Sequence, residues 1–95
     1  MSERSDMVIF VKIVEQGNMT RAGRELRMTA GAVTKRLARL EARLGVRLLN
    51  RTTRKISTTE AGDTFYEKSL QLLNDIDSLE SSVSMFGDTP TGTLK

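Results

Sequence analysis

Residues 17–45 read GNMTRAGRELRMTAGAVTKRLARLEARLG, and this stretch predicts two helices joined by a tight turn. Asn18 and Thr29 are residue types that cap helix N-termini, so we expect helices over about 19–27 and 30–44. One glycine stands before the first cap and another follows the second helix, as glycines commonly do where helices end. Two helices in this arrangement predict a helix-turn-helix.

The second helix of the pair has an apolar face and a basic face. Its apolar residues recur at spacings of four and three, so we expect them to be buried: Val33, Leu37, Leu40 and Leu44. The basic residues off this stripe should be available to solvent or to a partner: Lys35, Arg36, Arg39 and Arg43. The small residues of the first turns suit a helix whose N-terminal end enters the major groove of DNA.

Further elements are predicted on both sides of the pair. A helix should run from near Ser5 to residue 16, and its core-facing stripe is Met7, Phe10, Val11 and Val14. Residues 46–58 are rich in Thr and aliphatic residues, which favours two short strands joined by a basic turn at 52–55. The expected fold class is therefore mainly α: a winged helix-turn-helix of three helices and a short β-hairpin wing, followed by a long dimerisation helix.

That long helix, over about 60–86 and capped by Thr59, has the most regular pattern in the sequence. One seam alternates spacings of four and three: Phe65, Ser69, Leu72, Ile76, Leu79, Val83 and Phe86. Such a seam favours a partner helix, and a helix about 37 Å long exceeds what the small globular part can cover. A shorter stripe of Tyr66, Leu70 and Leu73 should pack back on the first three helices. The seam therefore predicts a homodimer interface; the alternative is that both stripes are buried within one monomer.

Charge divides the chain into two parts. Up to Thr58 there are 13 Lys and Arg and 5 Asp and Glu, a net charge of +8. From Thr59 onward there are 2 and 7, a net charge of −5, so that the whole chain carries +3. A small domain at +8 predicts nucleic acid as its partner, because phosphate contacts supply most non-specific affinity. The alternative is a well-solvated basic surface.

Several function classes are excluded by composition. The sequence has no Cys and no His, which excludes disulfides, common zinc sites and His-based acid–base catalysis. No paired carboxylates, nucleophile or phosphate loop converge, so we expect no catalytic residue, metal or cofactor. The longest apolar run, residues 7–11, is too short for a membrane span, and no signal-peptide pattern precedes it. A cytosolic protein is expected.

The run GNMTRAGRELRMTAGAVTKRLARLEARLGVRLLNRTTRKISTTEAG, residues 17–62, is similar to the signature of bacterial LysR-type transcriptional regulators. The matching positions are Ala22, Leu26, Val33, Leu40, Glu41, Leu44, Gly45, Leu48, Arg51, Arg54, Thr59, Ala61 and Gly62. The resemblance covers about residues 7–62, and the last helix stands where the family has its linker helix. It implies a cytoplasmic, nucleoid-associated protein that binds an interrupted palindrome in promoter DNA as a homodimer, with a tetramer as the alternative at full length.

The family's base-reading positions correspond to Ala30, Gly31, Thr34 and Lys35. Two depart from the family pattern, since Gln is common at Ala30 and Pro or Ser at Gly31. Alanine cannot make the bidentate contact to adenine that glutamine makes. Specificity is therefore expected to move to the other two positions and the wing, or to DNA shape. Further DNA contacts are expected from Thr20, Thr29 and Arg39.

The wing contributes two arginines to the predicted site, Arg51 and Arg54. The resemblance implies that the wing touches the minor groove or its flanking phosphates, where Arg is favoured. For Arg51 the alternative is a structural ion pair with an acidic residue such as Glu41. Glu41 itself is expected to be structural, and Arg47 and Lys55 are expected to be surface charges.

The chain divides into three parts: a DNA-binding domain at 1–59, with its helix-turn-helix at about 19–39 and its wing at about 46–58; a dimerisation helix at 60–86; and a hinge at 87–95. The ending TPTGTLK resembles the point where the family's linker leads into its effector-sensing domain. We therefore expect the natural protein to continue into a domain that binds a small-molecule effector.

The orientation of the dimer has two interpretations. Leu72 and Leu79 alternate with Ile76 and Val83, an arrangement associated with parallel two-stranded coils. The family resemblance implies antiparallel linker helices, and we favour it because a short seam tied to globular domains need not follow rules from free coils.

Two other functions are open at this point. One is a non-specific architectural DNA-binding protein, which gains weight from Ala30 and Gly31. The other is a protein-interaction module built on the seam, with an incidental basic face.

Overall fold

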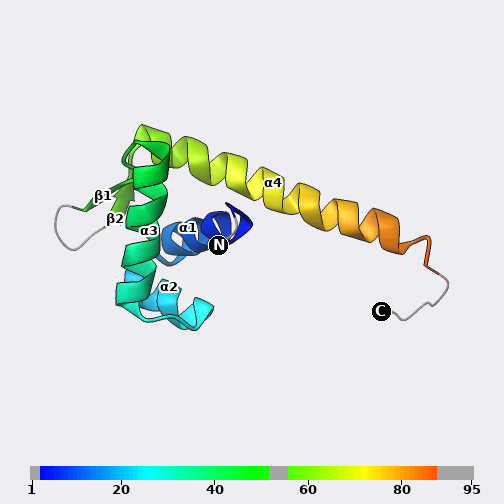
Figure 1. The fold of residues 1–95 in the computed structure, drawn as a ribbon, viewed down its shortest axis with the longest axis horizontal. Helices are drawn as coiled ribbons and strands as arrows, with labels where there is room; N and C mark the ends of the chain where they lie inside the picture. The colour runs from blue at the N-terminus through cyan, green and yellow to red at the C-terminus, as the bar shows by residue number, and fades with distance from the viewer. Residues whose placement is uncertain (1–2, 52–55, 88–95) are drawn as a thin grey trace.

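The computed structural model describes residues 3–51 and 56–87 and has the winged helix-turn-helix architecture that the sequence predicts (Figure 1). The elements follow in the order α1 (Glu3–Gln16), α2 (Met19–Leu26), α3 (Ala30–Leu44), β1 (Leu49–Arg51), β2 (Ile56–Thr58) and α4 (Glu60–Ser84). The strands pair antiparallel, with Leu49 opposite Thr58 and Arg51 opposite Ile56. The turn expected at 52–55 lies outside the described residues.

Three helices begin at the predicted caps. Asn18 Oδ1, Thr29 Oγ1 and Thr59 Oγ1 each accept a hydrogen bond from the amide three residues later, at 2.9–3.0 Å. Each cap satisfies one of the N–H groups that a helix start leaves without a partner inside the helix. Other ends differ by about two residues, which is ordinary fraying: α1 begins at Glu3 and α4 ends at Ser84.

The core forms where the first three helices meet the base of the wing. Its buried apolar residues are Ile9, Phe10, Ile13, Ala22, Val33, Leu37, Leu40, Leu48 and Leu49. Most of the predicted α3 stripe is included, and each large aliphatic side chain contributes roughly 1.5–3 kcal/mol by its burial. Leu44, the last member of that stripe, is 40% exposed, which contradicts the prediction. It lies at the very end of α3, where the chain turns away through Gly45 at φ +72°.

α1 buries a wider face than its predicted stripe. Phe10 is fully buried, but Met7 and Val14 are only half-buried, and Ile9 and Ile13, outside the stripe, belong to the core. The reason is that α1 lies between two neighbours, with α2 and α3 on one side and α4 on the other. A helix contacted from two sides hides more than the single stripe of a surface helix.

Leu48 joins α3, the wing and α4. Its N–H donates to Glu41 Oε2 at 2.8 Å, and its carbonyl accepts from the Thr59 amide at 3.0 Å. The Thr59 hydroxyl donates to the Arg47 carbonyl at 2.7 Å, while it also caps α4. Leu48 and Val46 were expected in a strand, but both precede β1, because these bonds hold the segment across the end of α3.

Two glycines allow backbones to approach closely. A Cβ at Gly23 would lie 2.4 Å from the Met28 carbonyl oxygen, and a Cβ at Gly62 would lie 2.0 Å from the Leu48 carbonyl oxygen. The first contact shows that Gly23 permits close packing at the turn of the helix-turn-helix. The second fixes the first turn of α4 directly on the segment that leads into the wing.

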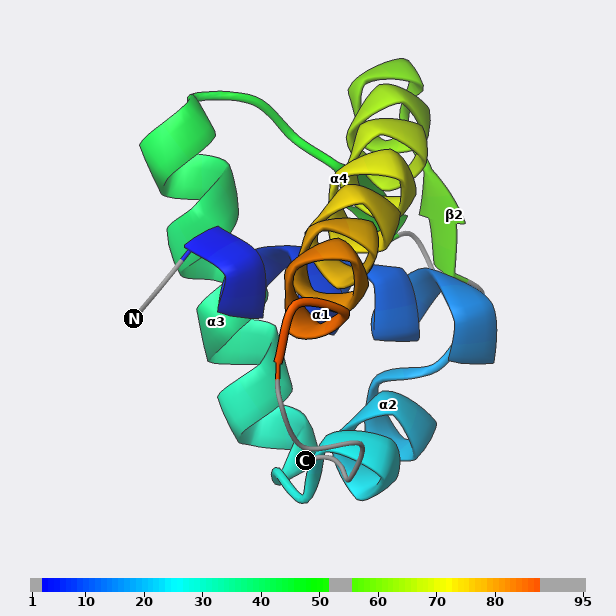
Figure 2. The ribbon, with the colours of Figure 1, turned by 90° about the vertical axis from the view of Figure 1, so that its right-hand side faces the viewer.

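α4 packs on α1 at its start and then projects away from the rest of the molecule (Figures 1 and 2). The Phe65 ring lies edge-on to the Phe10 ring, with centroids 5.3 Å apart, and Ser69 is buried. Beyond these residues the helix extends the molecule to 53 Å, against 25 and 21 Å in the other directions. Residues 3–51 and 56–59 are called the head from here on.

We expect Gly62→Ala to lower the free energy of unfolding by about 2–3 kcal/mol, because the added methyl group overlaps the Leu48 carbonyl. Gly31→Ala is the matched control: its Cβ meets nothing within 4 Å in the first turn of α3, so stability should rise by up to about 1 kcal/mol. Urea unfolding followed by circular dichroism measures both. Equal midpoints for the two variants would contradict the close approach.

Candidate nucleic-acid interface

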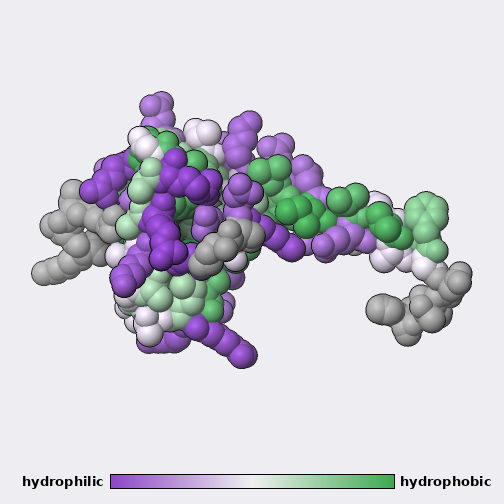
Figure 3. Space-filling view, in the orientation of Figure 1, coloured by the Kyte–Doolittle hydropathy of each residue, from purple (hydrophilic) through white to green (hydrophobic). Residues whose placement is uncertain are grey.

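α3 presents a continuous exposed face on the side away from the core. Gly31, Lys35, Ala38 and Ala42 recur at spacings of four, three and four and are all exposed, with Arg39 beside them. Because glycine and alanine have small side chains, the lysine and the arginine project beyond the rest of this face. Figure 3 shows hydrophilic side chains along the helix. Such a face can enter a DNA groove far enough for long side chains to reach base edges or phosphates. The two alanines were absent from the predicted site, although their spacing from Gly31 could have identified them.

Thr34 and Ala30 lie at the edge of this face, and both are half-buried. Thr34 Oγ1 donates to the Ala30 carbonyl at 2.9 Å, so the hydroxyl hydrogen is used within the helix. The side chain can therefore offer a partner its methyl group and an accepting oxygen. Those two features suit a thymine methyl group and a base amino group, respectively.

The predicted contacts at the helix starts have different surroundings. Thr20 is exposed in the first turn of α2, and Thr29 is exposed immediately before α3. The Thr29 hydroxyl accepts from the Ala32 amide, so its role in this structure is to cap α3. The starts of α2 and α3 can still direct backbone N–H groups and the positive ends of the helix dipoles toward an anion.

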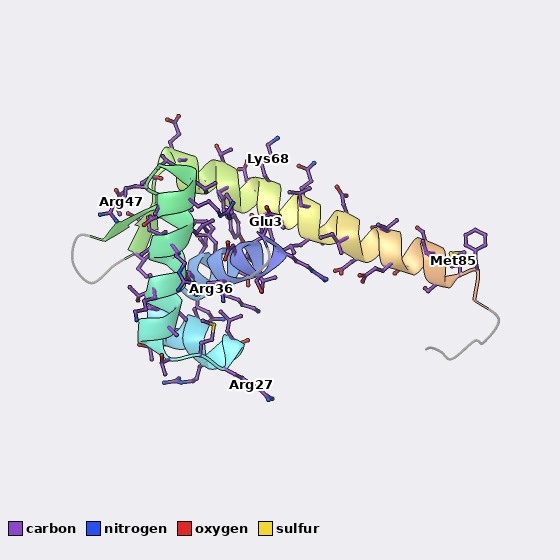
Figure 4. The ribbon with its side chains drawn as sticks, viewed as in Figure 1. Glu3, Arg27, Arg36, Arg47, Lys68 and Met85 are labelled. Atoms are coloured by element: carbon purple, nitrogen blue, oxygen red, sulfur yellow. The ribbon has the colours of Figure 1, made fainter. Side chains whose placement is uncertain are left out.

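Asp6 pairs with two arginines of the predicted basic set. Arg36 Nη2 donates to Asp6 Oδ1 at 3.1 Å, and Arg43 Nη2 donates to Asp6 Oδ2 at 3.0 Å. The Arg36 side chain is only 16% exposed and lies between α3 and the start of α1 (Figure 4). The expectation that Arg36 is available to solvent or to a partner is therefore wrong, because it holds α1 against α3, whereas Arg43 pairs with Asp6 and its side chain stays 48% exposed. Lys35 and Arg39 remain exposed.

α2 supplies arginines that the sequence analysis did not single out. Arg21, Arg24 and Arg27 recur every three residues and are all exposed. Arg27 ends the helix in the left-handed conformation, at φ 59°, and its side chain points away from the body of the molecule (Figure 4). Arginine at regular helical spacing was the signal available in the sequence. These side chains add three exposed positive charges on and directly after the helix that precedes α3.

At the base of the wing, Glu41 has the structural role expected of it. Its buried carboxylate accepts from the Leu48 and Leu49 amides at 2.8 and 3.2 Å and pairs with Arg47 at 3.5 Å. Arg47 is itself largely exposed, at the base of the wing (Figure 4). The predicted contact Arg54 and the side chain of Arg51 lie outside the described part of the chain.

The predicted seam of α4 divides into two parts. Phe65 and Ser69 pack within the monomer, and the stripe of Tyr66, Leu70 and Leu73 is half-buried as well. Four seam residues beyond them are 50–86% exposed, Leu72, Leu79, Val83 and Phe86, while Ile76 is half-buried. Hydrophobic side chains follow the projecting helix in Figure 3. The alternative in which one monomer buries both stripes is therefore wrong for this outer part.

Within residues 3–51 and 56–87, every helix is too short or too polar to cross a lipid bilayer. The same residues include no group of three or more His, Cys, Asp or Glu side chains that could hold a metal ion.

We expect Asp6→Asn to lower the free energy of unfolding by about 1–2 kcal/mol, because it leaves the mostly buried Arg36 without its carboxylate. The exposed Arg43 should contribute little to this loss. Urea unfolding measures the effect. Glu15→Gln, which removes one exposed partner of Lys12, is the control and should change stability by less than about 0.5 kcal/mol. If the two variants had the same free energy of unfolding, the ion pairs of Asp6 would not stabilise the head.

Comparison with known sequences gives a family match over most of the head. The family described as "Bacterial regulatory helix-turn-helix protein, lysR family" matches residues 5–63. The transcriptional activator AaeR of Escherichia coli is 37% identical over 95 residues, which are all of this chain and 31% of that protein. A transcriptional repressor of Pseudomonas aeruginosa is 42% identical, over all of this chain and 30% of its own length. The chain thus spans about a third of the curated relatives that it matches.

Solved structures agree with this match. The BenM DBD in complex with benA site 1 DNA superposes with a TM-score of 0.88 at 29% identity, covering 92% of this chain and 98% of that one. The CbnR DBD–DNA complex superposes with a TM-score of 0.77 at 32% identity, covering 88% and 95%. Family match, relatives and fold agree: this chain belongs to the LysR family of bacterial regulatory helix-turn-helix proteins.

Proposed function

We propose that this chain is the sequence-specific, double-stranded DNA-binding part of a LysR-type transcriptional regulator. The observation that carries the proposal is the shallow exposed face of α3, from which Lys35 and Arg39 project. Its opposite face is fixed by the core through Val33 and Leu37. A helix held in this way can be inserted into the major groove without rearrangement.

Charge supports the same assignment. The part of the chain before Thr59 has a net charge of +8, whereas the part from Thr59 onward has −5. Phosphate neutralisation by the basic part supplies affinity and orientation, which do not depend on sequence. The three exposed arginines of α2 fit this role, together with the start of that helix at Thr20.

Base readout is assigned to few residues. Lys35 can reach a guanine edge, and Thr34 can contact a thymine methyl group. Ala30 and Gly31 offer no hydrogen-bonding side chain, so DNA shape and the wing, with Arg51 and Arg54, should contribute more than is usual for the family. This distribution predicts specificity that tolerates some substitutions in the half-site.

Dimerisation through α4 completes the proposed function. Its apolar side chains beyond Ile76 are exposed in the monomer, and a second copy would cover them. Two heads held in this way would place two α3 helices in adjacent major grooves of an interrupted palindrome. We assign residues 1–59 to DNA binding, 60–86 to association and 87–95 to the connection with a further domain.

Relatives about three times as long as this chain support the presence of that further domain. We propose that it binds a small-molecule effector, that the whole protein acts in the bacterial cytoplasm as a dimer or tetramer, and that its role is binding, not catalysis. The named relatives are an activator and a repressor, so the family match fits either direction of regulation.

We expect Lys35→Ala and Arg39→Ala each to weaken binding to a promoter palindrome by about tenfold. The salt dependence of binding shows which kind of contact each residue makes. Loss of a phosphate contact lowers the slope of log affinity against log salt concentration by about 1, whereas loss of a base contact relaxes the sequence specificity. Fluorescence anisotropy at several salt concentrations measures both. Lys12→Ala, which removes a lysine that pairs with Glu15 and Glu25 on another face, should change the affinity less than about twofold. Losses equal to that of the control would contradict the assigned face.

The specificity of the whole chain needs a separate measurement. At one stated salt concentration, affinity for the palindrome should exceed affinity for bulk DNA by about a thousandfold or more. Affinities within a factor of a few would instead identify a non-specific architectural protein.

We expect Leu79→Lys to weaken self-association by at least about tenfold, because it places a charge at a position that is 63% exposed in the monomer and covered in the dimer. Ser81→Lys introduces the same side chain on the opposite face of α4 and should leave association unchanged. Sedimentation equilibrium measures both, and circular dichroism should show unchanged helix content. Equal association of the two variants would place the dimer interface elsewhere.

A further inference from the structure

A cavity of about 380 Å³ lies between the start of α1 and the turn that joins α2 to α3. Two arginines line it, Arg4 from α1 and Arg36 from α3, and none of the described residues in its lining is acidic. Small-molecule sites commonly combine apolar walls with a few polar groups, and their volumes begin at about 300 Å³. The apolar walls of this cavity are formed by Val8, Ile9, Leu26 and Met28.

Arg36 has more hydrogen-bond donors than this structure uses. A guanidinium group carries five N–H donors, and here Nη2 donates to Asp6 Oδ1 at 3.1 Å. No other described residue accepts a hydrogen bond from the Arg36 side chain. Because that side chain is only 16% exposed, its remaining donors have limited access to water, and donors in such surroundings are normally satisfied. An acceptor in the cavity would satisfy them.

The charge around the cavity favours an anion. Asp6 is shared between Arg36 and Arg43, at 3.1 and 3.0 Å. Arg4 is exposed and forms no ion pair with any described residue. Three guanidinium groups against the Asp6 carboxylate give a net charge of +2, which becomes +1 when the exposed Glu3 is also counted. A ligand with a single negative charge would therefore be attracted to this side of the head.

We propose that this cavity binds a small organic acid. The carboxylate accepts hydrogen bonds from the remaining donors of Arg36, and Arg4 contributes its charge at the edge of the site. Hydrogen bonds between a guanidinium and a carboxylate are among the stronger ones in proteins. The apolar body of the ligand covers Val8 and Met28, which are half-buried in this structure, and gains by leaving water.

The position of the cavity links the ligand to the helix-turn-helix. Leu26 and Met28 lie on either side of the residue that ends α2, and Arg36 belongs to α3. A bound acid would therefore contact α1, the turn and α3 together and hold them in their present arrangement. Lys35 and Arg39 are not in the cavity lining, so the exposed face of α3 stays free for DNA. This site goes beyond the proposed DNA binding and does not depend on it.

An NMR titration of the whole chain tests the site without DNA. The probe is cyclohexanecarboxylate, used at constant ionic strength near pH 7, where a carboxylic acid is ionised. Two matched compounds separate its features: acetate has the carboxylate without the ring, and cyclohexylmethanol has the ring without the charge. The backbone amide and arginine Nε–H signals of ¹⁵N-labelled protein are followed for each compound.

Two pairs of changes locate the binding. Arg4→Gln removes a charge at the edge of the cavity, and Arg21→Gln removes the same charge from an exposed position on α2. Arg36→Lys keeps a positive charge beside Asp6 but loses the planar set of donors. Circular dichroism of each variant establishes that it is folded. If Arg36→Lys fails to fold, the Arg4→Gln variant and the comparison of compounds decide the matter.

We expect cyclohexanecarboxylate to bind with a Kd of about 1 mM and to shift the signals of Val8, Met28 and Arg36 Nε–H most. Acetate and cyclohexylmethanol should bind at least about ten times more weakly. Arg4→Gln should weaken binding about threefold and Arg36→Lys about tenfold, whereas Arg21→Gln should change it less than about 1.5-fold.

Three results would overturn the proposal. One is the absence of shifts at the cavity residues at about 20 mM probe, well above the expected Kd. Another is equal binding of acetate, or shifts spread over the exposed arginines of α2, which would indicate attraction by charge alone. The third is an equal effect of Arg4→Gln and Arg21→Gln, which would place the binding outside the cavity.

Discussion

The peptide group of Leu48 is the point on which the arrangement of this structure depends. Its N–H is satisfied by the Glu41 carboxylate of α3, its carbonyl accepts from the first residue before α4, and its side chain is in the core. A buried amide without an acceptor would cost about 1–3 kcal/mol, and Glu41 accepts from two of them. Three elements are thus placed by one segment: α3, the wing and α4. Gly62 lets the first turn of α4 approach the same carbonyl more closely than any residue with a Cβ could.

Features set by local chemistry could be predicted from the sequence. The caps at Asn18, Thr29 and Thr59 act within three residues, so the starts of three helices followed directly from residue type. The buried part of the α3 stripe followed from its spacing. Features that depend on the position of another element could not be predicted in this way. Arg36 looked available on its own helix, but Asp6, thirty residues earlier, takes it up.

The same reasoning explains the differences in α4 and at the end of α3. Phe65 belongs to the regular seam by spacing, yet α1 places Phe10 against it, so it stabilises the monomer. Leu44 has the spacing of a core residue, but the chain leaves the core one residue later. Periodicity identifies which residues of a helix share a face; it does not say how far along the helix that face has a partner. In both α3 and α4, one face of the helix packs on the core over part of its length and is exposed to solvent over the rest.

Because the start of α4 is held rigidly on the head, the length of α4 sets a fixed distance. Since Gly62 and Thr59 fix the start of α4 on the head, the distance between the two heads of the proposed dimer would be determined by the length of the helix rather than by a flexible joint. Adding one residue would turn the seam by about 100° and misdirect it, whereas adding seven would keep its direction and lengthen the helix by roughly 10.5 Å. The spacing of DNA half-sites that such a protein can read should therefore evolve in steps of whole heptads, so that a change of operator spacing and a change of α4 length have to occur together.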